Sequence, residues 1–213
     1  MTTASLVLAS RSARRAQLLR EAGYTFEQVD PPFDDPPQPE AFSGKCALDL
    51  VVDLATRKCT SLSDQGNTKQ LNPESVILGA DTLCLGPAGQ WLGQPATRQQ
   101  ARQMIVQFVG STHEVVTGVA LVRSDQGRTE SFVDVASVRF GHLDERRISV
   151  YLDSGQWQGK AGAYNLFDRQ ADGWAIDVTG DPTTVVGLPM RRLVPRLQRW
   201  GVGPLSSLGR SRR

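Results

Sequence analysis

The sequence predicts an α/β fold, in which a mixed central sheet is flanked by helices. Segments with the pattern of strands and segments with the pattern of helices follow one another in an irregular order, unlike the strict alternation of a βαβ protein. Hydrophobic residues make up 39% of the 213 residues and charged residues 22%, so the chain can bury a core and is not disordered throughout. This length suits one large domain or two closely packed lobes.

A buried strand followed by a helix is expected at the start of the chain. Residues 5–10 (SLVLAS) are a short apolar run that ends in small residues, which is typical of a buried strand. Residues 14–22 predict a helix because their apolar side chains fall on one face. Ser12 can cap the start of this helix, and Gly23 can end it.

The middle of the chain predicts a second strand between two further helices. Helices are expected at 44–62, where apolar residues recur at helical spacing, and at 97–109. Residues 75–85 (SVILGADTLCL) predict a second buried strand that Gly79 interrupts. Residues 30–39 are rich in Pro and Asp and therefore predict a loop.

The rest of the chain predicts a pair of strands and then shorter elements. Residues 114–122 and 130–140 alternate enough to be paired strands, with a turn at 125–127 between them. Beyond them we expect a helix at 143–154, a loop at 159–162, a strand at 174–178 and a terminal helix at 187–200, which Pro195 should kink.

One domain is expected over residues 1–203, followed by a disordered basic tail at 204–213. Three of the last four residues are arginines, behind a stretch rich in Gly and Ser. Such a tail can contact nucleic acid, but three arginines make a weak electrostatic footprint. A solvated tail is therefore the favoured interpretation, and nucleic acid is not an expected partner.

The expected location is the cytoplasm. No run of about 18 apolar residues is present, so no membrane span is predicted, and the N-terminus lacks the basic-then-apolar order of a signal peptide. Three widely spaced cysteines form neither a disulfide framework nor a CxxC zinc pattern. We expect Cys46 and Cys84 to be packed and Cys59 to be partly exposed.

The segment LASRSARR at residues 8–15 has the composition of a phosphate cradle. A strand ends in small residues, and a turn flanked by serines leads into a helix that carries Arg14 and Arg15. The N–H groups at a helix start, with Ser10 and the two arginines beside them, can bind phosphate oxygens. The alternative is a capped helix with two solvated arginines, which this segment alone favours.

Asp81 is the candidate acid of the site. It directly follows the apolar run VILGA, at the carboxyl end of a strand, where α/β folds place their sites. A carboxylate there can hold Mg²⁺ or orient a water molecule, and an aspartate that caps a turn is an equal alternative. Asp34 and Asp35 in the Pro-rich loop can share a hard cation with Asp81, or they can be ordinary surface acids.

Two lysines and a histidine complete the candidates. Lys58 ends the predicted helix at 44–62, where a lysine is usually a partner of the helix dipole. Lys160 lies in GKAGAY, whose small residues allow the backbone to approach a ligand, although a plain glycine turn has the same sequence. His113 is more typical of a structural residue than of a catalytic one. With two histidines and no HExxH pattern, zinc catalysis is not expected.

Six segments of the chain, in order, carry a resemblance to one family. They are LASRSARR at 8–15, Asp34 with Asp35, ILGADT at 77–82, STHEVVTGVAL at 111–121, GKAGAYN at 159–165 and GDPTTVVGLPM at 180–190. Together they resemble the signature segments of the Maf family of nucleoside triphosphate pyrophosphatases, over nearly the whole chain from about residue 6 to residue 200.

The resemblance implies two lobes with a cleft between them, a homodimer, and hydrolysis of non-standard or pyrimidine nucleoside triphosphates to monophosphate and pyrophosphate. It also implies a divalent cation, Mg²⁺ or Mn²⁺. The family's phosphate-side positions fall on Ser10, Arg14, Arg15 and Lys58. The catalytic acid, as base or metal ligand, falls on Asp81, and Asp35 stands where the family usually has a Glu, as a second metal ligand.

This chain also departs from the family pattern at two functional positions. Gln94 stands where the family usually has a lysine, and Lys160 is our candidate for the replacement cation on the phosphate side. Phe167 stands where many members have Gln or Glu, and strand-like alternation would place either Phe167 or Asp168 in the cleft. A nucleotide-binding regulator with little turnover, and a nucleic-acid-binding module that uses the tail, are the alternative functions.

Overall fold

The computed structural model describes residues 4–33, 46–64, 71–72, 74–123, 125 and 127–205. Within these residues the chain forms a seven-stranded sheet of order β2-β1-β3-β5-β6-β7, with β4 beside β3. β1 pairs in parallel with β2 and β3, whereas β3, β5, β6 and β7 pair antiparallel. The predicted α/β fold with a mixed central sheet is therefore confirmed.

The strands and helices have the following bounds. The strands are β1 (Leu6–Ala9), β2 (Glu27–Val29), β3 (Val76–Leu85), β4 (Trp91–Leu92), β5 (Thr112–Arg123), β6 (Arg128–Phe140) and β7 (Ile176–Thr179). The helices are α1 (Ala13–Glu21), α2 (Ala47–Asp64), α3 (Arg98–Phe108), α4 (Glu145–Asp153), α5 (Leu166–Ala171), α6 (Pro182–Val186) and α7 (Met190–Arg199), with a 3₁₀ turn at Ala161–Ala163.

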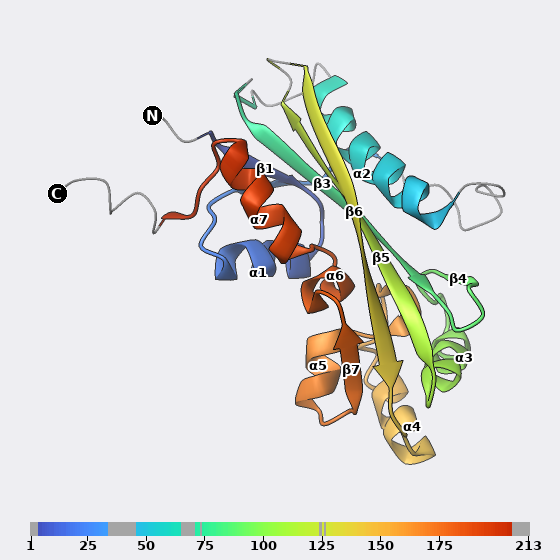
Figure 1. Ribbon diagram of the computed structural model, residues 1–213. Coiled ribbons are helices and arrows are strands. Elements are labelled where there is room, and N and C mark those ends of the chain that lie inside the picture. The colour runs from blue at the N-terminus through green and yellow to red at the C-terminus, as the bar shows by residue number, and fades with distance from the viewer. Residues whose placement is uncertain are drawn as a thin grey trace.

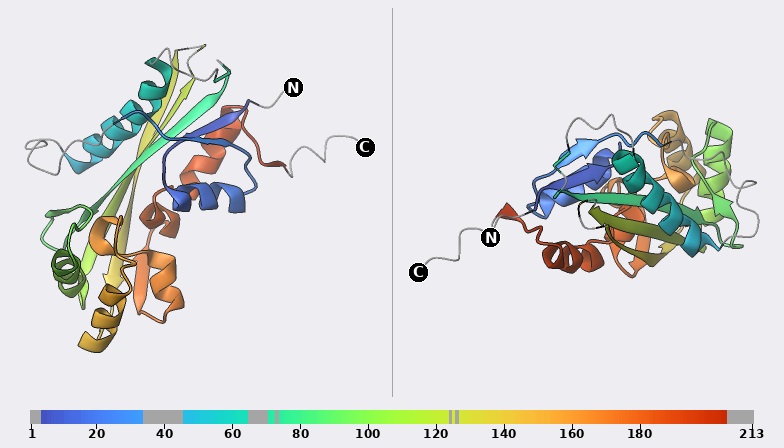
Figure 2. Two further views of the ribbon diagram at one scale, coloured as in Figure 1. Left: turned by 180° about the vertical axis from the view of Figure 1, so that it is seen from behind. Right: turned by 90° about the horizontal axis from the view of Figure 1, so that it is seen from above.

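Helices cover both faces of the sheet (Figure 1). α2 lies along one face, and α1 and α7 lie on the other, which Figure 2 shows from behind and from above. The long strands β5 and β6 run from this region to a second group of helices, α3, α4 and α5. A single sheet thus joins the two groups of helices. The division into two lobes stays a prediction.

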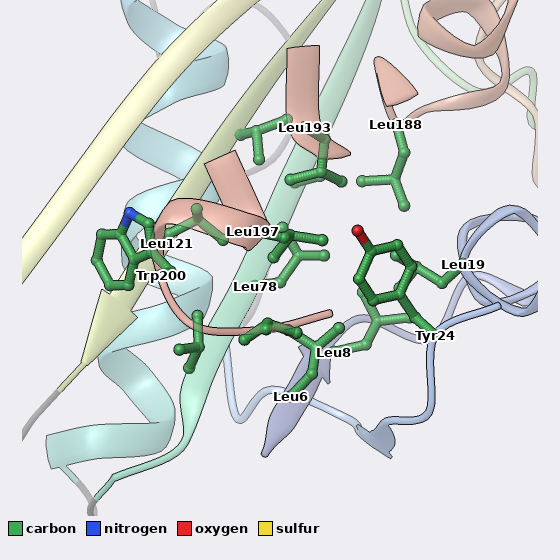
Figure 3. Close-up of a cluster of buried hydrophobic side chains, with 14 of the residues drawn as sticks. Leu6, Leu8, Leu19, Tyr24, Leu78, Leu121, Leu188, Leu193, Leu197 and Trp200 are labelled. Carbon is green, nitrogen blue, oxygen red and sulfur yellow. The ribbon is translucent and has the colours of Figure 1, made fainter. Parts of the chain in front are cut away.

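The core consists of separate clusters on either side of the sheet. On the side of α1 and α7, leucines from both helices meet Leu78 and Leu121 of the sheet, and Trp200 closes the cluster (Figure 3). On the side of α2, Ala55, Cys59 and Leu62 pack against β1, β3 and β5. Burial of these side chains fixes α1 and α2 on opposite faces of β3.

β3 is continuous through Gly79, so the predicted interruption of this strand is wrong. The glycine is required by the helix above it, because a Cβ at Gly79 would lie 2.4 Å from the carbonyl oxygen of Ala55. The same holds at Gly118 on β5, where a Cβ would lie 2.4 Å from the carbonyl oxygen of Val51. These two glycines let α2 pack directly on the backbone of the sheet.

The cysteine expectations are corrected at two positions. Cys46 is exposed, whereas Cys59 and Cys84 are buried and all three are free thiols. Cys59 is buried because α2 presents it to the sheet, where its thiol contacts the carbonyl oxygens of Ile77 and Ala120. Burial raises the pKa of the Cys59 thiol, and likewise that of Cys84, to about 12.

The two ends of the described chain lie together. The backbone N–H of Ala4 donates to the carbonyl oxygen of Gly201 at 3.2 Å. Most of the predicted basic tail, residues 206–213, lies outside the described residues. Among the helices that the structure describes, none is both long enough and apolar enough to cross a membrane.

Candidate active site

A cavity of about 650 Å³ lies at the carboxyl ends of the parallel strands β1 and β3. The pairing of these strands ends with Ala9 opposite Gly79. β3 continues past the end of β1, paired there with β5, and Asp81 and Thr82 of this continuation border the cavity. The cavity lies beyond the carboxyl end of β1, where open α/β sheets bind ligands, but Asp81 is in the middle of β3 and not at its end as expected, because β3 extends four residues beyond it in its pairing with β5.

Five of the predicted site residues border this one cavity, namely Ser10, Arg14, Arg15, Lys58 and Asp81. They come from the end of β1, the first turn of α1, the last turns of α2 and the middle of β3. The structure therefore brings together residues that are up to 71 positions apart in the sequence, from Ser10 to Asp81.

The segment between β1 and α1 is arranged as a helix start that can receive an anion. Ser12 caps α1 as predicted, since its side chain accepts a hydrogen bond from the backbone N–H of Arg15 at 3.4 Å. The hydroxyl of Ser10 accepts from the N–H of Ser12 at 3.2 Å. The first turn of α1 borders the cavity, so the partial positive charge of the helix start lies beside it.

The two adjacent arginines have different surroundings. The guanidinium of Arg15 donates to three protein acceptors: the Ser10 hydroxyl at 3.2 Å, the Thr82 hydroxyl at 3.1 Å and the Gly187 carbonyl at 3.0 Å. Burial lowers the pKa of Arg14, while the nearby Asp168 and Tyr151 act in the opposite direction. Arg15 thus belongs to the wall of the cavity, and Arg14 is a partly desolvated cation beside it.

Lys58 forms an ion pair with Asp81, with 2.6 Å between Nζ and Oδ1. The two side chains are only 9% and 13% exposed. The helix continues past Lys58 to Asp64, so the prediction that Lys58 ends it is wrong. The close packing of α2 on Gly79 places Lys58 over the next part of β3, and it balances the buried carboxylate there.

Lys160 lies at the edge of the cavity rather than in its wall. Its neighbours Gly159 and Ala161 are among the described residues that border the cavity, whereas Lys160 itself is not. Its ammonium group donates to the backbone carbonyl of Gln156. Burial and, next, the charge of Arg14 lower the pKa of Lys160, and Asp168 acts in the opposite direction.

The metal prediction can be examined at only one of its two ligands. Asp34 and Asp35 lie outside the described residues, and in the part of the chain that is described no group of three or more His, Cys, Asp or Glu side chains could hold a metal ion. Mg²⁺ is commonly held by one or two carboxylates together with substrate phosphates and water. The Asp81 carboxylate fits that mode of binding.

Of the two residues that depart from the family pattern, Gln94 borders the cavity and Phe167 does not. Gln94 borders the cavity, as does Asn165, whose side-chain N–H donates to Asp168 at 2.7 Å. Phe167 is on α5 and is 42% exposed, and it is not among the described residues that border the cavity. The expected strand-like alternation of Phe167 and Asp168 is wrong, because residues 166–171 form a helix.

His113 is buried below the cavity wall rather than in it. Its Nε2 lies 2.8 Å from the Tyr164 hydroxyl, and its ring stacks on Phe108 with centroids 3.9 Å apart. Burial lowers the pKa of His113 to about 4, so the imidazole is neutral at pH 7. This arrangement fits the structural role that the sequence favoured.

Three cavity residues with polar side chains were not singled out from the sequence. Arg11 and Thr82 belong to the quoted segments LASRSARR and ILGADT, and their polar side chains at the strand ends were an available signal. Tyr164 was part of GKAGAYN, but no pattern indicates that its ring would border the cavity. Arg11 is the most accessible of the three and pairs with Asp30 at 3.2 Å.

The protein is of the α/β class, and arginine, lysine and serine side chains surround one aspartate in its cavity, a composition that suits a phosphorylated ligand. Residues 5–200 match the family model described as Maf-like protein. The chain belongs to this family.

Curated relatives agree with this assignment. The chain is 37% identical over 196 residues to a dTTP/UTP pyrophosphatase of Symbiobacterium thermophilum, covering 92% of this chain and 94% of the relative. It is 39% identical over 197 residues to a dTTP/UTP pyrophosphatase of Halalkalibacterium halodurans, covering 92% and 96%. A protein of the same name from Pelotomaculum thermopropionicum is 34% identical over 200 residues, covering 94% and 98%.

Proposed function

We propose that this protein hydrolyses the nucleoside triphosphates dTTP and UTP to the corresponding monophosphates and pyrophosphate. Its relatives at 34–39% identity are named dTTP/UTP pyrophosphatases, and they align with it over more than nine tenths of its length. The observation that carries the proposal is the grouping of Asp81 with Ser10, Arg14, Arg15 and Lys58 around one cavity at the strand ends.

The cations and the helix start provide the binding site for the triphosphate. The N–H groups at the start of α1 and the Arg14 guanidinium bind phosphate oxygens, and Arg15 holds the Ser10 hydroxyl in place beside them. Lys58 orients Asp81 through their ion pair and also borders the cavity, where its ammonium group can contact a phosphate. Lys160 contributes positive charge at the edge.

Asp81 acts on the attacking water. It accepts a proton from a water molecule that attacks the α-phosphorus in line with the leaving oxygen, so that the new P–O bond forms as the bond to pyrophosphate breaks. Alternatively, Asp81 with Asp35 would hold the Mg²⁺ or Mn²⁺ ion. When bound, such a cation neutralises phosphate charge and polarises the phosphoryl oxygens.

A pyrophosphate-release assay tests the proposal. Purified protein is mixed with dTTP, UTP, CTP and purine triphosphates in the presence of Mg²⁺ or Mn²⁺, and pyrophosphate is measured. Fastest release from dTTP and UTP supports the proposal. Nucleotide binding without release of pyrophosphate would instead support the regulator alternative.

Asp81→Asn should lower the rate of release by about two orders of magnitude or more, because the amide can neither accept the proton nor carry the charge. The matched control is Asp153→Asn, since Asp153 is 62% exposed and pairs with Arg98 outside the cavity. Thermal unfolding of both variants verifies that they are folded. A folded Asp81→Asn protein with an unchanged rate would exclude this role.

We further propose that residues 1–203 form one domain, that the protein is a cytoplasmic homodimer, and that nucleic acid is not a partner. These proposals are supported by the Maf resemblance and by the modest net charge of +2. Light scattering coupled to size-exclusion chromatography tests the dimer. Binding to nucleic acid that disappears on deletion of residues 204–213 would contradict the last proposal.

A further inference from the structure

Behind the cavity, threonine hydroxyl groups form a row that runs from strand to strand on one face of the sheet. Thr82 of β3 lies opposite Thr117 of β5, and Thr117 lies opposite Asp134 of β6. Residues that are opposite each other on neighbouring strands point to the same face of a sheet. On that face α6 packs against β5 and β6 and adds Thr184, and we call Thr82, Thr117 and Thr184 the hydroxyl row.

The hydrogen bonds of the hydroxyl row have one possible direction. The Thr117 hydroxyl lies 2.8 Å from the Thr184 carbonyl oxygen, which can only accept, so the single proton of Thr117 is used there. The Thr82 hydroxyl, 3.0 Å from that of Thr117, must therefore donate to it. Because its proton is committed, Thr82 is an acceptor for the Arg15 guanidinium at 3.1 Å.

The row is buried and anchored at its outer end. Thr117 and Thr184 are both 0% exposed. The Thr184 hydroxyl donates to the Asp134 carboxylate at 2.6 Å, and Arg192 of α7 lies 3.3 Å from the other oxygen of that carboxylate. Buried hydroxyls that lose their partners are costly, so the Thr184 hydroxyl holds α6 on β6, the Thr184 carbonyl orients the Thr117 hydroxyl, and Thr117 orients that of Thr82.

At its inner end the row reaches the cavity through Arg15. The Arg15 guanidinium is held by Ser10, Thr82 and Gly187, which come from three separate segments of the chain. Gly187 ends α6, and a Cβ at this position would lie 3.0 Å from Nε of Arg15, so the guanidinium is tightly enclosed on that side. The row thus connects the cavity wall with β6 and α7 on the same face of the sheet.

We propose that Thr117 is a positioning residue of this enzyme, which acts through Thr82 to hold Arg15 and the Ser10 hydroxyl in the geometry that the triphosphate needs. Thr117 does not border the cavity and therefore acts only through its neighbours. The proposal rests on the proposed function for its activity readout. It is separate from the roles of Asp81 and Lys58, which are linked through α2 on the other face of β3.

The test compares two substitutions of nearly the same size. Thr117→Val keeps the branched shape and removes the hydroxyl, whereas Thr117→Ser keeps the hydroxyl. We expect Thr117→Val to lower kcat/KM for dTTP about tenfold, because small displacements of positioning groups reduce rates strongly. Thr117→Ser should restore at least half of the wild-type value. Thr112→Val, on an exposed position of the same strand, is the control and should have no effect.

A double-mutant cycle separates positioning from general destabilisation. If Thr117 acts through Arg15, Thr117→Val should have little further effect in an Arg15→Lys background, whereas independent effects would multiply. Multiplicative effects, a wild-type rate in Thr117→Val, or no recovery in Thr117→Ser would overturn the inference.

Binding of inorganic pyrophosphate provides a readout that does not depend on turnover. Calorimetry should show an approximately tenfold weaker binding by Thr117→Val and recovery in Thr117→Ser, because Arg15 and Ser10 border the cavity in which phosphates would bind. If wild-type protein releases no pyrophosphate from any nucleotide, the proposed function fails, and this binding measurement still decides the role of Thr117. Equal affinities in wild type and Thr117→Val would overturn it.

Discussion

Adjacent residues of the same type can have different functions when their surroundings differ, as Arg14 and Arg15 show. All three nitrogens of Arg15 bond to protein acceptors. Burial lowers the pKa of Arg14, and the charge of Asp168 acts in the opposite direction. The sequence assigned both arginines to the phosphates as a pair, and the contacts add a positioning role for Arg15.

Arg14 is therefore expected to be sensitive to both charge and shape. Arg14→Ala should lower kcat/KM for dTTP by roughly one to two orders of magnitude, because charge-assisted contacts to phosphate are lost. Arg14→Lys should recover only part of this loss, since an ammonium group cannot reproduce a bidentate fork. The measurement is steady-state pyrophosphate release.

Arg20→Ala is the matched control for this prediction. Arg20 is on the same helix, and its guanidinium lies over the ring of Phe26 at 5.3 Å, outside the cavity lining. Its removal should leave kcat/KM unchanged. Equal activity of Arg14→Ala and wild type would show that Arg14 does not contact the substrate.

At the scale of elements, the packing of α2 on the sheet determines where Lys58 lies. The backbone of α2 passes so close to β3 that Gly79 cannot carry a Cβ, and Lys58 follows Ala55 by less than one helical turn. Asp81 is two residues beyond Gly79 on the same face of β3. The close approach of α2 to β3 therefore brings the Lys58 ammonium group within reach of the Asp81 carboxylate.

Gly79→Ala should disturb both stability and catalysis. The added methyl group would lie 2.4 Å from the Ala55 carbonyl oxygen, so α2 must move outward, at a cost of about 1–3 kcal/mol in the free energy of unfolding. The same movement separates Lys58 from Asp81 and should lower the rate of pyrophosphate release. Chemical denaturation and the release assay measure the two effects.

Gly127→Ala controls for the loss of a glycine alone. An added Cβ there meets nothing within 4 Å, although the φ of +58° penalises an L-residue by about 1–2 kcal/mol. We expect this variant to lose some stability and to keep its activity. A fully active Gly79→Ala protein would contradict the link between α2 packing and the site.

The short helix α5 changes the expectation for nucleobase selection. Its first turn places Phe167 away from the cavity lining, while Asn165, just before the helix, borders the cavity. The Asn165 amide nitrogen donates to the Asp168 carboxylate at 2.7 Å, so the amide carbonyl oxygen is directed elsewhere. That oxygen can accept a hydrogen bond from the substrate.

Asn165→Ala should therefore change the ratio of kcat/KM between dTTP and CTP by about tenfold, the effect of about one hydrogen bond. Phe167→Gln, the matched variant two residues further on, should leave the ratio within about twofold of wild type. Competition assays with both nucleotides measure the ratios. A change in Phe167→Gln and none in Asn165→Ala would reverse the assignment.

At the scale of the whole molecule, His113 makes stability depend on pH. Its folded-state pKa of about 4 is below the ordinary value of 6.5 because burial disfavours the imidazolium. The unfolded chain therefore binds a proton first as the pH falls. The stabilising contribution is fully present above about pH 6.5, decreases through the window from 6.5 to 4, and is absent below it, a loss of about 3 kcal/mol.

His113→Gln should have a weaker pH dependence of unfolding than wild type across this window, whatever its stability at pH 7. Urea denaturation at half-unit steps of pH measures the dependence. His142→Gln keeps His113 and serves as the control, because these two are the only histidines in the chain. Identical slopes for wild type and His113→Gln would exclude a buried neutral imidazole.

The long elements were predictable from the sequence because each carries a repeated apolar pattern. β5, β6, α2 and α3 were expected within a few residues of their observed bounds. β2 and β4 have three and two residues and were not predicted, because such short strands depend on their neighbours in the sheet. α5 is likewise too short for its own periodicity to identify it.

The chemical types of the site residues were predictable, but their partners were not. The motifs identified Ser10, Arg14, Arg15 and Asp81, the family resemblance added Lys58, and all five border one cavity. The pairing of Lys58 with Asp81 and the bond from Arg15 to Gly187, 172 residues away, depend on packing that no local pattern encodes. The hydroxyl row likewise depends on strand register.

The three thiols differ in accessibility, so their rates of alkylation can measure local opening of the structure. Cys46 is exposed, whereas Cys59 under α2 and Cys84 beside the cavity are buried with pKa values of about 12, and only a thiolate reacts at an appreciable rate. An alkylating reagent will therefore modify one thiol of the closed molecule at once. Cys59 and Cys84 will be modified only when the structure around each opens locally, so mass spectra of the separate cysteine peptides, taken over time, give an opening rate for each face of the sheet.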